Sequence, residues 1–138
     1  MKVLKFGGTS VGSPERIKGV KKIIESQKSD CVVVVSAFQG ITDELKQTSE
    51  LACAQNHEFK AHLDRITTRH TECAKQLVQS IKLKSVMDAL DKIFSDLEAT
   101  LNGIYLVREL SRHSLDQVLS AGEMLSSIII SNLISDCL

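Results

Sequence analysis

An apolar segment at residues 3–6 runs directly into two adjacent glycines, Gly7 and Gly8, and this order strongly constrains the fold. Glycines at the end of a strand let the chain turn sharply and let backbone N–H groups approach a ligand. Lys5 adds a mobile cation, and the loop continues with two hydroxyl side chains, Thr9 and Ser10. Such a loop suits phosphate groups, although a lone glycine pair also marks an ordinary strand-to-helix turn.

The first third of the chain predicts a β-α-β unit. Ser13 and Pro14 mark a helix start, with Ser13 as the N-cap and Pro14 at the first helical position. Apolar residues then recur at helical spacing to about Gln27. Residues 31–35 form a continuous run of one cysteine and four valines, which predicts a parallel strand buried on both faces. A helix of this length can join it in parallel to the strand at residues 2–6.

A second loop of small and hydroxyl-bearing residues follows the second predicted strand. This loop, residues 36–43, contains Ser36, Gly40 and Thr42. Ligands of open parallel sheets bind outside the carboxyl ends of the strands. Two such loops side by side therefore indicate a site more strongly than either loop alone.

The remainder of the chain is helical in pattern. Apolar residues at three- and four-residue spacing predict helices around residues 45–52, 59–77, 87–104 and 114–134. The apolar stripe of the third helix is interpreted as core packing, with a coiled-coil face as the alternative. No repeat, linker or low-complexity segment indicates a domain boundary.

The last predicted helix carries a second candidate group. Glycine inside a helix costs about 1 kcal/mol relative to alanine, so Gly122 requires a packing or access reason. On a helical wheel Glu123 lines up with Ser120 and Ser127. Glu123 therefore lies either on the solvent face of an amphipathic helix or towards a pocket, where it could hold a ligand ammonium group.

Composition excludes several classes of function. Seventeen basic residues offset seventeen acidic ones, aromatic residues make up 4%, and tryptophan is absent, so no nucleic-acid or membrane-surface partner is expected. The four cysteines and four histidines lack metal-site spacing, so no metal site is predicted and the histidines are expected on solvated helix faces. No leader segment and no apolar stretch of membrane-spanning length are expected, which favours a cytoplasmic protein with reduced thiols.

Three motifs, in order, resemble those of the aspartate kinases of the amino acid kinase superfamily. Residues 5–11, Lys-Phe-Gly-Gly-Thr-Ser-Val, resemble the N-terminal signature of that family. Val-Ser-Ala at 35–37 with Gly-Ile-Thr-Asp at 40–43 resembles its second glycine loop, and Ser-Ala-Gly-Glu at 120–123 resembles its serine–glycine–glutamate motif. Residues 103–110 also resemble the kinase half of the bifunctional aspartokinase–homoserine dehydrogenases.

The resemblance implies a fold and a reaction. The fold would be the N-terminal part of a three-layer α/β domain, with short parallel strands covered by helices and a helix-rich second half. The reaction would transfer the γ-phosphoryl group of Mg-ATP to the β-carboxylate of L-aspartate, the first step towards lysine, threonine and methionine. The metal-organising residues would lie outside this chain, and the full enzyme would be a homo-oligomer.

The resemblance also implies a role for each motif. Lys5 would stabilise the transferring phosphoryl group, while Thr42 and Glu123 would bind the aspartate, Glu123 through its ammonium group. The nucleotide phosphates would be bound by Lys5 with the two loops, namely Gly7, Gly8, Thr9, Ser10, Ser36 and Gly40. Phosphoryl transfer depends on positioning and electrostatic stabilisation, which a lysine and loop amides can supply.

The chain departs from the family pattern at Gln39 and Ala121, and residues 1–138 would form only the N-terminal, amino-acid-binding side of the catalytic domain. We therefore expect this chain alone to lack kinase activity and to leave a sheet edge exposed. Two alternatives stay open: a superfamily member acting on another carboxylate or on a carbamate, and a non-catalytic helical interaction module. A dinucleotide-binding domain is disfavoured because the glycines do not follow G-x-G-x-x-G.

Overall fold

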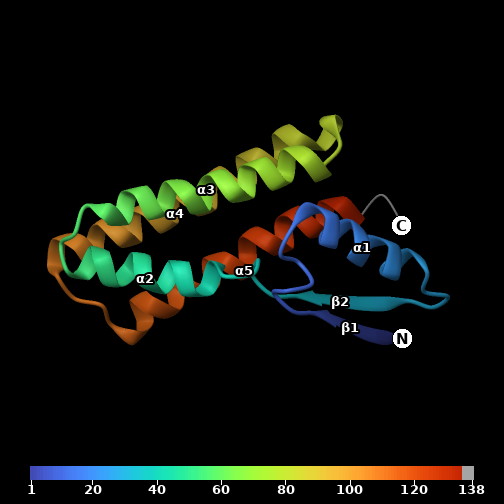
Figure 1. Ribbon diagram of the computed structural model, residues 1–138, viewed down its shortest axis with the longest axis horizontal. Coiled ribbons are helices and arrows are strands. Elements are labelled where there is room, and N and C mark those ends of the chain that lie inside the picture. The colour runs from blue at the N-terminus through green and yellow to red at the C-terminus, as the bar shows by residue number, and fades with distance from the viewer. Residues whose placement is uncertain (135–138) are drawn as a thin grey trace.

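The structure is a computed structural model that describes residues 1–134, and it combines a small parallel sheet with a bundle of long helices (Figure 1). In chain order the elements are β1 (Lys2–Phe6), α1 (Pro14–Glu25), β2 (Cys31–Val35), α2 (Ile41–Cys53), α3 (Glu58–Leu77), α4 (Ser80–Val107) and α5 (Arg112–Ile134). The two strands and α1 lie at one end, and α2, α3 and α4 extend away from them. Helix α5 runs from the bundle to the sheet and so joins the two parts.

The predicted β-α-β unit is confirmed. Strands β1 and β2 pair in parallel, with Lys2 opposite Cys31 and Phe6 opposite Val35. Helix α1 begins at the expected position because the Ser13 side chain accepts a hydrogen bond from the Arg16 backbone N–H at 3.3 Å. The carboxyl ends of both strands consequently meet at one edge, where the two glycine loops begin.

The expectation that the second strand is buried on both faces is wrong for the residues that the structure describes. Val33 and Val35 pack against the helical core, whereas Val32 and Val34 are 46% and 42% exposed. On β1, Val3 lies on the same open face and is 67% exposed. The difference arises because helices α1 and α5 cover one face of the sheet, and nothing in residues 1–134 covers the other.

The helical bundle supplies most of the core. The stripe on α4 is core packing as expected, with Leu90, Leu97 and Leu101 buried. Helix α5 differs from expectation, since over 18 residues its mean hydropathy of 1.3 makes it long and apolar enough to cross a membrane by length and composition. In this fold α5 packs against α2 and α4, and apolar side chains of α5 such as Leu125 and Ile129 are buried in the core.

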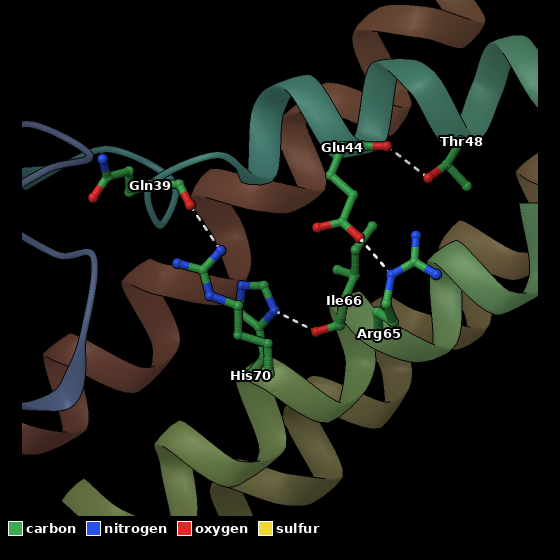
Figure 2. Close-up of polar contacts among 7 residues, drawn as sticks. Gln39, Glu44, Thr48, Arg65, Ile66 and His70 are labelled. Carbon is green, nitrogen blue, oxygen red and sulfur yellow. Dashed lines mark hydrogen bonds and ion pairs between the residues drawn. The ribbon is translucent and has the colours of Figure 1, made fainter.

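His70 on α3 corrects the prediction that the histidines occupy solvated helix faces. Its ring is buried, stacked on Phe38 with ring centroids 4.8 Å apart and edge-on to Phe94 at 6.2 Å. The Nδ1–H donates to the Ile66 carbonyl at 2.7 Å, as Figure 2 shows, while Nε2 has no hydrogen-bond partner in the described part of the chain. Burial lowers the pKa of His70 to about 4, so the ring is neutral at pH 7.

Candidate functional site

The first glycine loop turns tightly at the end of β1. The Ser10 N–H donates to the Gly7 carbonyl at 2.9 Å, and the Val11 N–H donates to the Gly8 carbonyl at 3.2 Å. A Cβ on Gly7 would meet no atom within 4 Å, so this exposed residue faces open space. Thr9 is exposed beside it and Ser10 is half-buried. The loop therefore presents backbone and hydroxyl groups that a phosphate could approach.

The second loop leads from β2 into α2. The Ser36 N–H donates to the Phe6 carbonyl at 3.1 Å, which continues the parallel pairing beyond the strands. Gly40 is the N-cap of α2 and has φ of 82°, a left-handed conformation that favours glycine. No side chain caps this helix, and Thr42 is exposed in its first turn. The Ile41 amide donates to the Phe38 carbonyl at 3.0 Å, which leaves the first-turn amides of Thr42 and Asp43 to bind an anion.

The two loops pack directly against each other. A Cβ on Gly8 would lie 3.2 Å from the Ala37 carbonyl oxygen, and one on Gly12 would lie 2.7 Å from Gln39 Oε1. A side chain on Gly8 would therefore crowd the second loop, whereas Gly7 leaves space for a ligand. Sequence reasoning treated these two glycines alike.

Lys5 and Glu123 both lie beside β2 but on different elements. Lys5 is exposed on the open face of β1, opposite Val34 in the register. Glu123 is exposed on α5 and lines a groove of about 370 Å³ between that helix and β2. The groove is lined by Val33, Val34, Val35, Glu123, Met124 and Ser127. The helical wheel left open whether Glu123 lies on the solvent face or towards a pocket. In the structure Glu123 is exposed to solvent and also lines a groove.

Helix α5 is held close to the end of β2 by two neighbours of Glu123. Ser126 is buried, and its hydroxyl donates to the Ser36 carbonyl at 2.8 Å. Gly122 packs against Ala37, where a Cβ would come within 2.9 Å of the Ala37 Cβ. The glycine inside the helix therefore has a packing reason, and the backbone that carries Glu123 is held close to the second loop.

The structure brings the predicted phosphate-binding residues to one edge of the sheet and places the predicted aspartate-binding residues on two neighbouring helices. Thr42 starts α2, Glu123 lies on α5, and these helices pack together. Sequence reasoning missed Ser126, Arg16 and Arg69, which hold loops and helix in place. Their signals are weak in a sequence, because a serine or arginine on a helix is ordinary.

Within residues 1–134, no group of three or more histidine, cysteine, aspartate or glutamate side chains lies close enough to hold a metal ion. The described residues thus offer backbone amides, hydroxyls and a lysine for an anion, and a carboxylate for a cation. Such an arrangement can orient a phosphorylated ligand and an ammonium-bearing one at adjacent places.

Comparison with known proteins identifies relatives of this chain. The sequence profile of the Amino acid kinase family matches residues 1–137. The chloroplastic bifunctional aspartokinase/homoserine dehydrogenase 2 of Arabidopsis thaliana is 32% identical over 130 residues, covering 94% of this chain and 14% of the relative. The aspartokinase of Chlamydia trachomatis serovar D is 34% identical over 128 residues, covering 93% of this chain and 26% of the relative.

The fold has a counterpart among solved structures. The crystal structure of E. coli aspartokinase III in complex with aspartate and ADP superposes with a TM-score of 0.86 at 22% identity. The match covers 99% of this chain and 29% of that one. The expected α/β fold with short parallel strands and a helix-rich second half is thereby confirmed. The chain spans 14% to 26% of the length of the two relatives described above.

Proposed function

The chain belongs to the amino acid kinase family, and from this premise we propose that it forms the N-terminal, amino-acid-binding part of an aspartate kinase. The proposed reaction transfers the γ-phosphoryl group of ATP to the β-carboxylate of L-aspartate. Relatives of two kinds, bifunctional and monofunctional, carry the name aspartokinase, and the E. coli enzyme of similar fold is described with aspartate and ADP bound. The two alternatives, a different superfamily member and a helical interaction module, receive no support from these relatives.

The observation that carries the proposal is the pair of packed glycine loops at the carboxyl ends of β1 and β2. Gly7 and Gly40 are both exposed, and a Cβ on either would meet no atom within 4 Å. The amides of these loops and of the first turn of α2 would bind the nucleotide phosphates, with Lys5 beside them as a mobile charge. ATP, when bound, supplies the phosphoryl group.

The aspartate would lie on the α5 side of the same edge. Glu123 would bind its ammonium group through a charge-assisted hydrogen bond, and Thr42 would offer a hydroxyl. Ser126 and Gly122 keep the backbone of α5 close to the second loop, so the ammonium partner would keep its position relative to the phosphate partners. A carboxylate is ionised at neutral pH, so the attacking oxygen needs no general base.

Residues 1–134 do not fit a magnesium ion, because they contain no cluster of three or more histidine, cysteine, aspartate or glutamate ligands. We also propose that the full enzyme uses Mg-ATP and acts in the pathway to lysine, threonine and methionine. It would be a homo-oligomer and cytoplasmic.

A titration of the ¹⁵N-labelled 138-residue chain with ADP tests the nucleotide side. We expect amide shifts concentrated at Gly7, Gly8 and Gly40, and weaker binding in Lys5→Ala. Lys2→Ala is the matched control, since Lys2 is exposed on the same strand but lies away from the loop. Shifts confined to other regions, or no binding at all, would contradict the nucleotide site.

A chimaera tests the reaction. In it, residues 1–134 replace the matching residues of the chlamydial aspartokinase, and acyl phosphate formation is measured by trapping with hydroxylamine. We expect an aspartate-dependent signal, a loss of about 100-fold or more in kcat for Lys5→Ala, and a raised KM for aspartate in Glu123→Gln. The 138-residue chain alone should form no hydroxamate. A chimaera that accepts another carboxylate but not aspartate would overturn the substrate assignment.

A further inference from the structure

Arg69 of α3 reaches both glycine loops with one guanidinium group. Its Nη1–H donates to the Gln39 carbonyl at 2.7 Å, and its Nη2–H donates to the Gly12 carbonyl at 3.2 Å. Gly12 ends the first loop, and Gln39 lies in the second. Figure 2 shows the bond to the Gln39 carbonyl, with α3 lying directly below this loop. A side chain from the helical bundle therefore joins two segments that are 27 residues apart in sequence, from Gly12 to Gln39.

One aromatic ring lies against this guanidinium, and a second arginine also bonds to both loops. It lies 5.9 Å from the ring centroid of Phe38, which is itself stacked on His70, the next residue of α3. From the other side, Arg16 donates to the Thr9 carbonyl at 2.7 Å and to Gln39 Oε1 at 3.5 Å. Arg69 thus bridges the loops from α3, and Arg16 bridges them from α1.

The chemistry of the bridge requires arginine. A planar guanidinium presents parallel N–H groups that can reach two carbonyl oxygens at once, whereas a lysine ammonium is a single point charge on a flexible stem. Both acceptors are backbone carbonyls, so changes to other side chains of the loops leave the bridge in place. Where Gly8 and Gly12 face the second loop, they contribute no side chain to the contact, so backbone groups and the Gln39 side chain meet there.

We propose that Arg69 is a positioning residue that fixes the first glycine loop relative to the second and so sets the alignment of their phosphate-binding amides. It acts through the loops and does not itself touch the ligand. The effect on a nucleotide rests on the proposed function, whereas the coupling of the two loops does not. Displacement of reacting groups by about 1 Å can cost about 100-fold in rate, so such alignment matters for phosphoryl transfer.

Hydrogen exchange tests the coupling without any ligand. The reporters are the Ser10 and Val11 amides, bonded within the first loop, and the Ile41 amide, which donates to the Phe38 carbonyl in the second. In Arg69→Ala we expect exchange at both loops to accelerate about tenfold, as for the loss of a hydrogen bond to a charged group. Arg69→Lys should resemble Arg69→Ala, because charge alone does not bridge two carbonyls.

Arg65→Ala is the matched control. Arg65 lies one turn earlier on α3 and forms an ion pair with Glu44 at 3.4 Å, as Figure 2 shows, but makes no hydrogen bond or ion pair with residues 7–12 or 36–40 of the described structure. Its removal should leave both loops unchanged. Amides of the buried α4 segment, such as that of Leu101, report global opening and give the change in overall stability of each variant. Acceleration at one loop only, or loop exchange in Arg69→Ala no faster than in Arg65→Ala, would overturn the proposal.

Binding of ADP to the same variants tests the positioning role of Arg69 separately from the proposed nucleotide site. At a temperature at which every variant is folded, Arg69→Ala should weaken ADP binding about tenfold, and Arg65→Ala should leave it within about twofold. Wild-type affinity in Arg69→Ala, despite faster exchange at both loops, would overturn the positioning role. If the wild-type chain itself does not bind ADP, the proposed function fails, and the exchange experiment alone still decides whether Arg69 couples the loops.

Discussion

Gly122 of α5 lies against Ala37 at the end of β2, so closely that a Cβ built on Gly122 would come within 2.9 Å of the Ala37 Cβ. Two further atoms, Ile41 Cγ2 and Leu45 Cδ1, would lie 3.3 Å away. Helix α5 can therefore approach the second glycine loop only because this position lacks a side chain. The same contact sets the place of Glu123, the next residue.

Gly122→Ala should lower the free energy of unfolding by about 1–3 kcal/mol, because the added methyl overpacks a site bordered by the rigid Ala37 Cβ and two buried aliphatic side chains. This loss should outweigh the gain of about 1 kcal/mol from better helix propensity. Chemical denaturation of both forms gives the difference. Gly103→Ala on α4 is the control, since its Cβ would meet nothing within 4 Å, and it should stabilise the chain. A stabilising Gly122→Ala would contradict the packing argument.

Ser126→Ala should destabilise the chain by about 1–3 kcal/mol. The buried Ser126 hydroxyl donates to the Ser36 carbonyl at 2.8 Å, and its removal leaves that acceptor without this partner. Ser131→Ala lies on the same helix, where an exposed hydroxyl bonds only to the Ile128 carbonyl one turn back, at 3.1 Å. Urea denaturation should show little change for that variant. Equal effects of the two substitutions would argue against a special role for the Ser126 contact.

The buried His70 should make the folded chain less stable in acid. Burial lowers its pKa from 6.5 to about 4, so between these values the unfolded chain binds a proton that the folded chain does not. The free energy of unfolding should therefore fall as the pH falls from 6.5 towards 4, by about 2 kcal/mol at pH 5 from this residue. Denaturation of wild type and His70→Phe at pH 7 and pH 5 measures the effect. The phenylalanine variant keeps a ring against Phe38, and it should lose about that much of the pH dependence; an unchanged pH dependence would refute the assignment.

Cys73 should react slowly with thiol reagents in the native chain. Burial raises the pKa of its thiol to about 11, which leaves little thiolate at pH 8, and the side chain is 5% exposed. Cys31 and Cys53 are more accessible. Iodoacetamide labelling followed by peptide mass spectrometry should modify those two first and Cys73 only after addition of denaturant. Labelling of Cys73 at the rate of Cys31 would show that this part of the core opens readily.

The elements of this fold were predictable because their signals are local. The Ser13–Pro14 start of α1 depends on backbone groups within one turn, and the apolar spacing of α3, α4 and α5 depends on the helical period. The order of the glycine motifs also indicated the family. The burial of β2 was predicted incorrectly, because a run of valines shows that a strand is compatible with two covered faces but not which elements cover them.

By itself, the sequence determined that glycine-bearing loops, at residues 7–12 and around 36–43, would follow two parallel strands and that Glu123 would stand on the polar side of a helix. Only the tertiary structure decided how these parts meet. Arg69 bridges Gly12 and Gln39, Ser126 binds Ser36, and His70 lies buried beneath Phe38. Backbone propensity and hydrophobic period act over a few residues, whereas each of these contacts joins segments distant in sequence. Their geometry exists only once the helices have packed around one core.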